Sequence, residues 1–120
     1  MDKVDQESVL SVFNPVLKCR VIIDKGNWEN HIITNHPEVG GYLNSLIKQV
    51  LTSKGGIKCE YFISTTDPTN VLIYANCGHF QPLHFFLKMA VKKSKTVAFV
   101  KTIYPVHEIN TKGVIPYERN

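Results

Sequence analysis

Apolar and polar residues follow one another along this chain with two different periods, and the change of period separates extended from helical segments. The first two segments, residues 9–16 and 20–24, are predicted to be extended, and the second is rich in β-branched residues. Asn14 and Pro15 form the predicted turn between them, because both residues favour turns over strands.

Two helices are predicted next. Trp28 and Ile32 fall on one helical face, and Asn27 is the predicted N-cap. His36-Pro37 ends this first helix, because the residue before a proline is pushed out of the α region. The second helix follows a pair of glycines and carries one apolar stripe, which consists of Leu43, Leu46, Ile47, Val50 and Leu51.

The remainder of the chain is predicted to consist of strands. The expected strands are residues 57–64, 70–77, 83–91 and 96–104, with a short closing segment at 114–117. Polar, turn-forming stretches separate them, as in antiparallel hairpins. Early helices and a late run of strands predict an α+β fold with the helices packed on one face of an antiparallel sheet.

The composition places this pattern in one small domain. The chain has 120 residues, of which 43% are hydrophobic and 20% charged, as expected for a single domain over residues 1–120 with flexible residues 1–8. No apolar run approaches the roughly 18 residues of a membrane span, and the polar start does not resemble a signal peptide. We therefore expect a cytoplasmic protein without a membrane partner.

The three cysteines do not predict a disulfide framework, because their number is odd and the chain can bury its own core. Cys77 and His79 stand close enough to be zinc ligands, but no CxxC pair accompanies them. No metal and no cofactor are therefore expected. The net charge of +4 and the pI near 9.0 fit a polyanionic partner and an inert basic surface equally well.

Three segments carry polar residues that the pattern alone does not require. In the first, His31, His36 and Glu38 lie around the end of the first helix. Imidazole suits proton transfer near neutral pH, so the two histidines form a candidate acid–base pair. The alternative is structural, with His31 as a helix residue and His36 as a cap before the proline.

The second segment is the strand at residues 83–92. Alternation places its apolar residues on one face and leaves a basic and aromatic row on the other. Such a row can meet phosphates and a stacked base, although a solvated sheet face would have the same pattern. The row consists of His84, Phe86, Lys88 and Lys92.

The third segment is the strand at residues 96–104, in which Thr102 and Tyr104 point to the same face. Their hydroxyl groups can donate hydrogen bonds to a phosphate oxygen, and both residues are also ordinary strand formers.

These segments, in this order, resemble the barnase/EndoU/colicin/RelE-like nuclease superfamily, in particular its phage- and toxin-associated branch. The resemblance covers roughly residues 17–117. It is carried by the motifs Trp28-Glu29-Asn30-His31-Ile32, His36-Pro37-Glu38 and Val100-Lys101-Thr102-Ile103-Tyr104-Pro105.

The resemblance implies N-terminal helices packed on one face of a four- to five-stranded antiparallel sheet, and a metal-independent endoribonuclease, often a toxin. It carries His31, His36, Glu38, Thr102 and Tyr104 over as catalytic residues, whereas His84, Phe86, Lys88, Lys92 and Lys101 are the candidates for substrate binding. The chain departs from the pattern in two ways. Its only arginines are Arg20 and Arg119, and Lys101 stands where the motif more often has an apolar or small residue.

The sequence thus predicts a small endoribonuclease that cleaves RNA by attack of the 2′-OH group. Its partners would be RNA and a cognate antitoxin or immunity protein. The alternative is a non-catalytic module that binds RNA or protein on the same scaffold. Convergence of His31 and His36 with the face that bears Thr102 and Tyr104 would favour the enzyme.

Overall fold

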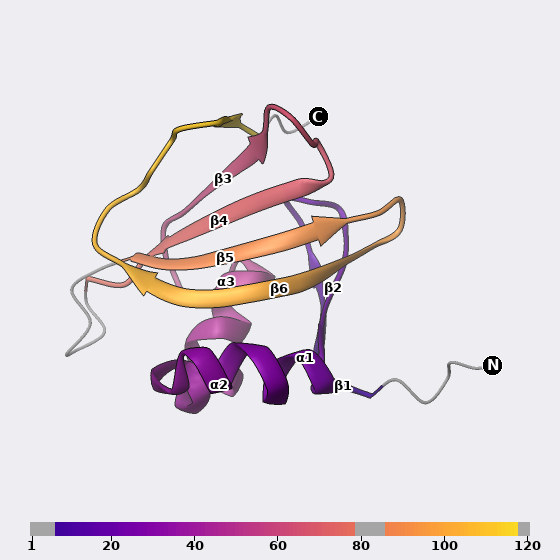
Figure 1. Cartoon of the computed structure of the whole chain (residues 1–120), viewed down its shortest axis with the longest axis vertical. Helices are drawn as coiled ribbons and strands as arrows, with labels where there is room; N and C mark the ends of the chain where they lie inside the picture. The colour runs from indigo at the N-terminus through magenta and orange to yellow at the C-terminus, as the bar shows by residue number, and fades with distance from the viewer. Residues whose placement is uncertain (1–6, 79–85, 118–120) are drawn as a thin grey trace.

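The strands of this protein form a single mixed sheet. The computed structural model describes residues 7–78 and 86–117. The seven strands have the order β1-β2-β6-β5-β4-β3-β7, and every neighbouring pair is antiparallel except β2 and β6, which run parallel (Figure 1). The strands are β1 (Ser8–Asn14), β2 (Cys19–Asp24), β3 (Cys59–Ser64), β4 (Asn70–Asn76), β5 (Phe86–Lys93), β6 (Val97–Val106) and β7 (Val114–Pro116).

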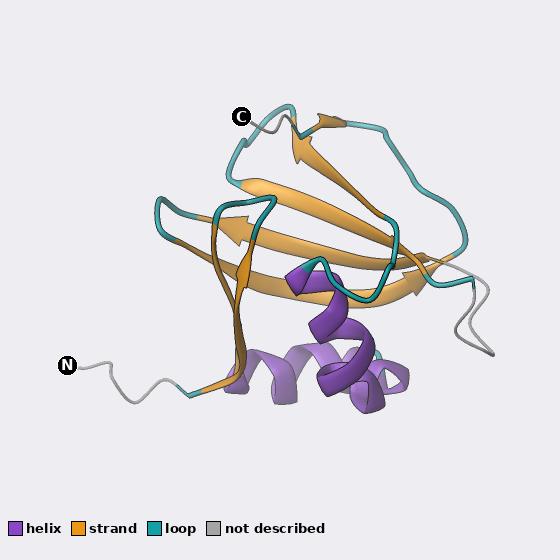
Figure 2. Ribbon diagram, turned by 180° about the vertical axis from the view of Figure 1, so that it is seen from behind, coloured by secondary structure: helices purple, strands orange, loops and turns teal. Residues whose placement is uncertain are grey.

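Two helical stretches connect β2 to β3. The first consists of α1 (Lys25–Asn27), a π-helical turn η2 (Trp28–Ile32) and α2 (Ile33–Asn35). The second consists of a 3-10 turn η3 (Pro37–Tyr42), a second π-helical turn η4 (Leu43–Ile47) and α3 (Lys48–Thr52). Both stretches lie on the same side of the sheet, where the first follows β6 (Figures 1 and 2).

The core fills the space between these helical stretches and one face of the sheet. Leu46, Ile47, Val50 and Leu51 are fully buried, as their predicted stripe requires, and Trp28 and Ile32 are buried beside them. They pack in one cluster with inward-facing residues of the strands. No helix of the described residues is long and apolar enough to cross a membrane.

The predicted fold class is wrong in its sheet. The sheet has seven strands and is mixed, rather than four to five strands that are all antiparallel. The helices are not N-terminal, because β1 and β2 precede them. These two segments were predicted to be extended, but a local pattern does not reveal a strand's partner. They form a hairpin whose β2 pairs with β6, with Arg20 opposite Val97, far away in the sequence.

A second difference concerns the start of the first helix. Asp24, not Asn27, is the N-cap, and its carboxylate accepts a hydrogen bond from the Asn27 backbone amide at 3.0 Å. The helix therefore begins earlier than predicted, and the Asn27 side chain points away from its own helix end.

Candidate functional site

The sheet has a core face and an open face, and the candidate residues of β5 and β6 lie on the open one. In β5, Leu87, Met89 and Val91 are buried in the core. Because side chains of a strand alternate between faces, Lys88 and Lys92 point the other way. The described members of the predicted basic row, Phe86, Lys88 and Lys92, thus lie on the side of the sheet that the helices leave uncovered.

A β-bulge at Lys101 places two further candidates on the same face. Ala90 of β5 pairs with Thr102, but the next residue of β5, Val91, pairs with Val100, so Lys101 is an extra residue in β6. Before the bulge the even-numbered side chains, Ala98 and Val100, point into the core. After Lys101 the odd-numbered Ile103 points into the core instead. Without this bulge, Thr102 and Tyr104 would not share a face with Lys88.

Asn27 binds the bulge from the first helical stretch. Its side-chain amide donates hydrogen bonds to the carbonyl oxygens of Val100 at 2.9 Å and Lys101 at 3.1 Å. A bulge interrupts the hydrogen-bond ladder, and Asn27 supplies donors that the ladder does not. The start of the helix is thereby tied to the point where β6 changes face.

Strand register then places ionisable side chains side by side across the open face. Glu60 of β3 pairs with Tyr74 of β4, Tyr74 pairs with Lys88 of β5, and Lys88 pairs with Tyr104 of β6. Directly paired residues on one face have their Cβ atoms about 4.5–5.5 Å apart, which is within contact distance for these side chains.

His36 reaches the end of this row from the helical side. Pro37 forces it out of the helix, and its backbone angles are φ −138° and ψ 71°. Its ring stacks on the Tyr104 ring, with centroids 4.9 Å apart and an interplanar angle of 17°. Glu38 lies beyond it, with Oε2 3.5 Å from His36 Nδ1.

Lys88 completes the group. Its Nζ lies 5.5 Å from the centroid of the Tyr104 ring and 5.6 Å from that of Tyr74. Burial acts to lower the pKa of Lys88, but hydrogen bonding and electrostatic attraction to the Tyr104 and Tyr74 side chains outweigh it, so the pKa is raised. Lys88 therefore stays cationic at neutral pH. We call His36, Tyr104 and Lys88 the central cluster.

Tyr74 supports Lys88 from the other side. It is buried, and its hydroxyl donates a hydrogen bond to the carbonyl oxygen of Asn110 at 3.2 Å. The Phe62 ring meets the Tyr74 ring edge to face at 5.8 Å. These contacts fix the orientation of Tyr74, so Lys88 is held against a rigid aromatic support.

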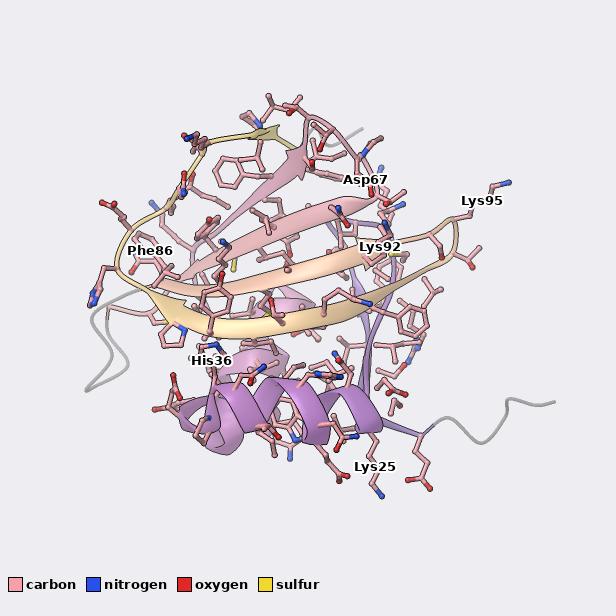
Figure 3. The ribbon with its side chains drawn as sticks, viewed as in Figure 1. Lys25, His36, Asp67, Phe86, Lys92 and Lys95 are labelled. Carbon is pink, nitrogen blue, oxygen red and sulfur yellow. The ribbon has the colours of Figure 1, made fainter. Side chains whose placement is uncertain are left out.

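Phe86 lies at the same end of the sheet as the central cluster. It borders a cavity of about 470 Å³ together with Lys58, Glu60, Tyr74 and Asn76. His36 and Phe86 are seen near the same ends of β5 and β6 in Figure 3. The Glu60 carboxylate and the Asn76 amide line the same cavity as Phe86.

Not all predicted site residues join the central cluster. The His31 side chain is exposed and makes no hydrogen bond, ion pair or ring contact with another described residue, so it does not pair with His36. Thr102 is exposed on the same face as Tyr104, and Lys101 is the exposed bulge residue. His84 lies outside the described residues, as does His79, which was considered with Cys77 as a zinc ligand.

Lys92 lies at the opposite end of β5 from His36 (Figure 3). Its Nζ forms an ion pair with Asp67 Oδ2 at 2.9 Å. Four residues along a strand separate it from Lys88, a distance of about 13 Å. Lys88 and Lys92 therefore share a face, as predicted, but belong to two different places on it.

Sequence reasoning missed Tyr74, Glu60 and Asn27. The sequence contains an indication for Tyr74, because its side chain bears a hydroxyl group and stands between the apolar residues Ile73 and Ala75. Its place beside Lys88 depends on strand register, which the sequence pattern does not specify. Asn27 was recognised as a helix-end residue, but its contact with β6 spans more than seventy positions.

Comparisons with known proteins identify no relative of this chain. No family model, no curated protein and no solved structure matches this chain. Within residues 7–78 and 86–117, no group of three or more histidine, cysteine or acidic side chains is arranged to hold a metal ion.

Proposed function

We propose that this protein is a metal-independent endoribonuclease and that the central cluster is its active site. One observation carries the proposal: His36 stacks on Tyr104, and Lys88 lies over the same tyrosine ring. A proton acceptor, a hydroxyl donor and a cation thus stand in contact, and cleavage of RNA by its own 2′-OH requires these three groups. The proposal rests on these side chains and not on the fold, because one fold hosts many functions.

The reaction follows from the positions of the three groups. His36 Nε2 takes the proton of the 2′-OH, and the 2′-oxygen bonds to phosphorus while the bond from phosphorus to the 5′-oxygen breaks. The Tyr104 hydroxyl gives its proton to the departing 5′-oxygen. Lys88 stabilises the extra negative charge on the phosphorane. The products are a 2′,3′-cyclic phosphate and a 5′-hydroxyl, and water returns the proton from His36 to Tyr104.

The remaining candidates have supporting roles in this proposal. Glu38 orients the His36 ring through Nδ1, and Thr102 donates a hydrogen bond to a phosphate oxygen. Phe86 stacks a base near the cleavage point. RNA is the partner of the site, and a cytoplasmic location and a cognate antitoxin or immunity protein belong to the same proposal.

The two histidines provide the test. Purified protein is incubated with labelled RNA in excess chelator, and the cleaved ends are mapped. His36→Ala is expected to lower the rate roughly 10²–10⁴-fold, the usual contribution of a general base. His31→Ala is the matched control, because His31 is exposed and outside the central cluster, and it is expected to keep the parental rate.

Three outcomes would contradict the proposal. Cleavage that stops in chelator, or products with 5′-phosphate ends, would indicate a metal nuclease. Equal losses in the two histidine variants would take the general base out of the central cluster. RNA binding without cleavage by the parental protein would identify a non-catalytic RNA-binding module.

A further inference from the structure

A second concave region lies on the sheet at the far end of β5 and β6 from His36. It is a groove of about 570 Å³. Pro68 and Thr69 of one turn form one wall, residues 92–95 of the hairpin between β5 and β6 form another, and Phe99 of β6 contributes an aromatic side chain. Figure 3 shows Lys92 and Lys95 at this end and His36 at the other.

Phe99 is the apolar feature of the groove. It belongs to β6 before the bulge, where Ala98 and Val100 point into the core, so Phe99 points away from the core. Its side chain is 37% exposed, which makes it one of three large hydrophobic residues on the described surface. An aromatic ring that is half open to solvent at the wall of a groove offers a stacking surface for a flat ligand.

The charge of the groove is positive. Lys92 is held by Asp67 at 2.9 Å, and Lys93 Nζ donates a hydrogen bond to the Ser94 carbonyl oxygen at 3.4 Å. The Lys95 side chain forms no ion pair or hydrogen bond with another described residue. Hydrogen bonds, first from the Thr69 hydroxyl and then from Lys92, lower the pKa of Asp67 to about 2. Asp67 is therefore ionised at neutral pH and engaged by Thr69 and Lys92, and the Lys95 ammonium group remains available for an anion.

We propose that this groove binds a nucleotide of a single RNA strand, with the base against Phe99 and a phosphate at Lys95. An aromatic platform beside cations is the arrangement with which proteins bind single-stranded nucleic acid. This inference rests on the proposed function, because it assigns to the same RNA a second contact point. Lys88 pairs with Tyr104 and Lys92 with Phe99, so the two points are about 13 Å apart along β5. The substrate is then an unpaired strand that crosses the open face.

Binding is measured separately from cleavage with fluorescent oligonucleotides that carry 2′-O-methyl groups and cannot be cut. Oligomers of about eight nucleotides are expected to reach the groove from the central cluster, whereas those of about two are not, by the usual site sizes of single-strand binders. Phe99→Ala is expected to weaken binding of the longer oligomer roughly 5- to 100-fold, and Phe99→Trp to retain it. Ile115→Ala is the control, since Ile115 is exposed on β7.

Charge gives a second readout. Lys95→Ala is expected to reduce the slope of log affinity against log salt by about 0.7, the contribution of one phosphate contact on a single strand. Lys54→Ala, at an exposed position after α3, is the control and is expected to leave the slope unchanged.

The outcomes separate this inference from the proposed function. Length-dependent binding that requires Phe99, without cleavage, would support the groove and refute the nuclease. Cleavage that depends on His36, with binding that is indifferent to length and to Phe99, would overturn the groove alone. Displacement of the oligonucleotide by polyglutamate at equal charge concentration would also overturn it, because the groove would then recognise an acidic protein.

Discussion

Tyr104 touches both other members of the central cluster, and its two contacts use different parts of the residue. Its ring stacks on His36 and faces Lys88, whereas its hydroxyl contributes to the raised pKa of Lys88. The ring is therefore a positioning element, and the hydroxyl is the proton donor in the proposed reaction. Removing the hydroxyl alone separates these two roles.

Tyr104→Phe is expected to keep the ring stack and to lower cleavage of RNA roughly 10²-fold, at the lower end of the range for general acids. With a uridine ester whose leaving group is p-nitrophenol, the same variant is expected to react at the parental rate, because that leaving group departs without a proton. His36→Ala is expected to be slow on both substrates. The measurement is the cleavage rate of each variant on RNA and on the p-nitrophenyl ester. An equal loss of rate for Tyr104→Phe on both substrates would contradict the assignment of Tyr104 as the general acid.

The residue types of the site could be predicted from the sequence, but their grouping could not. His36, Lys88 and Tyr104 were recognised by their chemistry and their strand faces. Both histidines lie near one helix end, and their residue type does not show which of them faces β6. Pro37 decides between them, because it turns His36 out of the helix and towards β6.

At the scale of elements, the bulge in β6 is decisive. Because strand side chains have a period of two, one extra residue moves every later side chain to the opposite face. Lys101 is that residue, and Thr102, Ile103 and Tyr104 take their faces from it. The role of Lys101 in the fold is thus independent of its charge, which was the reason for its prediction as a substrate contact.

Deletion of Lys101 is expected to abolish cleavage and to destabilise the protein by several kcal/mol, because Ile103 would leave the core and Thr102 and Tyr104 would enter it. Lys101→Ala is the matched variant and is expected to change the free energy of unfolding by about 0.5 kcal/mol or less, as for exposed sites. Urea unfolding of the two proteins tests this. Equal stability of the two proteins would mean that β6 re-forms in another register.

The positions of the elements could largely be predicted from the sequence. The stripe from Leu43 to Leu51 is helical, with Leu43 partly buried and the other four residues fully buried. Each predicted extended segment whose residues are described contains a strand. The number and order of the strands in the sheet could not be predicted, because they depend on the parallel pairing of β2 with β6. Periodicity reports which side of a strand is buried and carries no information about a partner so distant in the chain.

At the scale of the whole molecule, that pairing joins the N-terminal hairpin to the rest of the fold. The hairpin contributes Leu10, Leu17, Cys19, Val21 and Ile23 to the core. Burial of such side chains stabilises a protein by about 1.5–3 kcal/mol for each large residue, whereas the net free energy of unfolding of a whole domain is about 5–15 kcal/mol. The hairpin is therefore expected to be indispensable for folding.

A chain that begins at Lys25 is expected to lack a fixed tertiary structure, which NMR chemical-shift dispersion would reveal. Addition of a separate peptide of residues 7–24 is expected to restore the dispersion, because β2 can pair with β6 without a covalent connection. A well-dispersed spectrum of the shortened chain by itself would contradict the prediction.

The burial of Trp28 has a practical consequence. It is the chain's single tryptophan, and it lies in the core on the helical stretch that ends just before His36. Its fluorescence therefore comes from one known place and reports, without an added dye, whether that stretch stays docked. Emission that remains at short wavelength when RNA is added would indicate an active site assembled in advance, whereas a red shift would indicate that the helix lifts from the sheet to admit the strand.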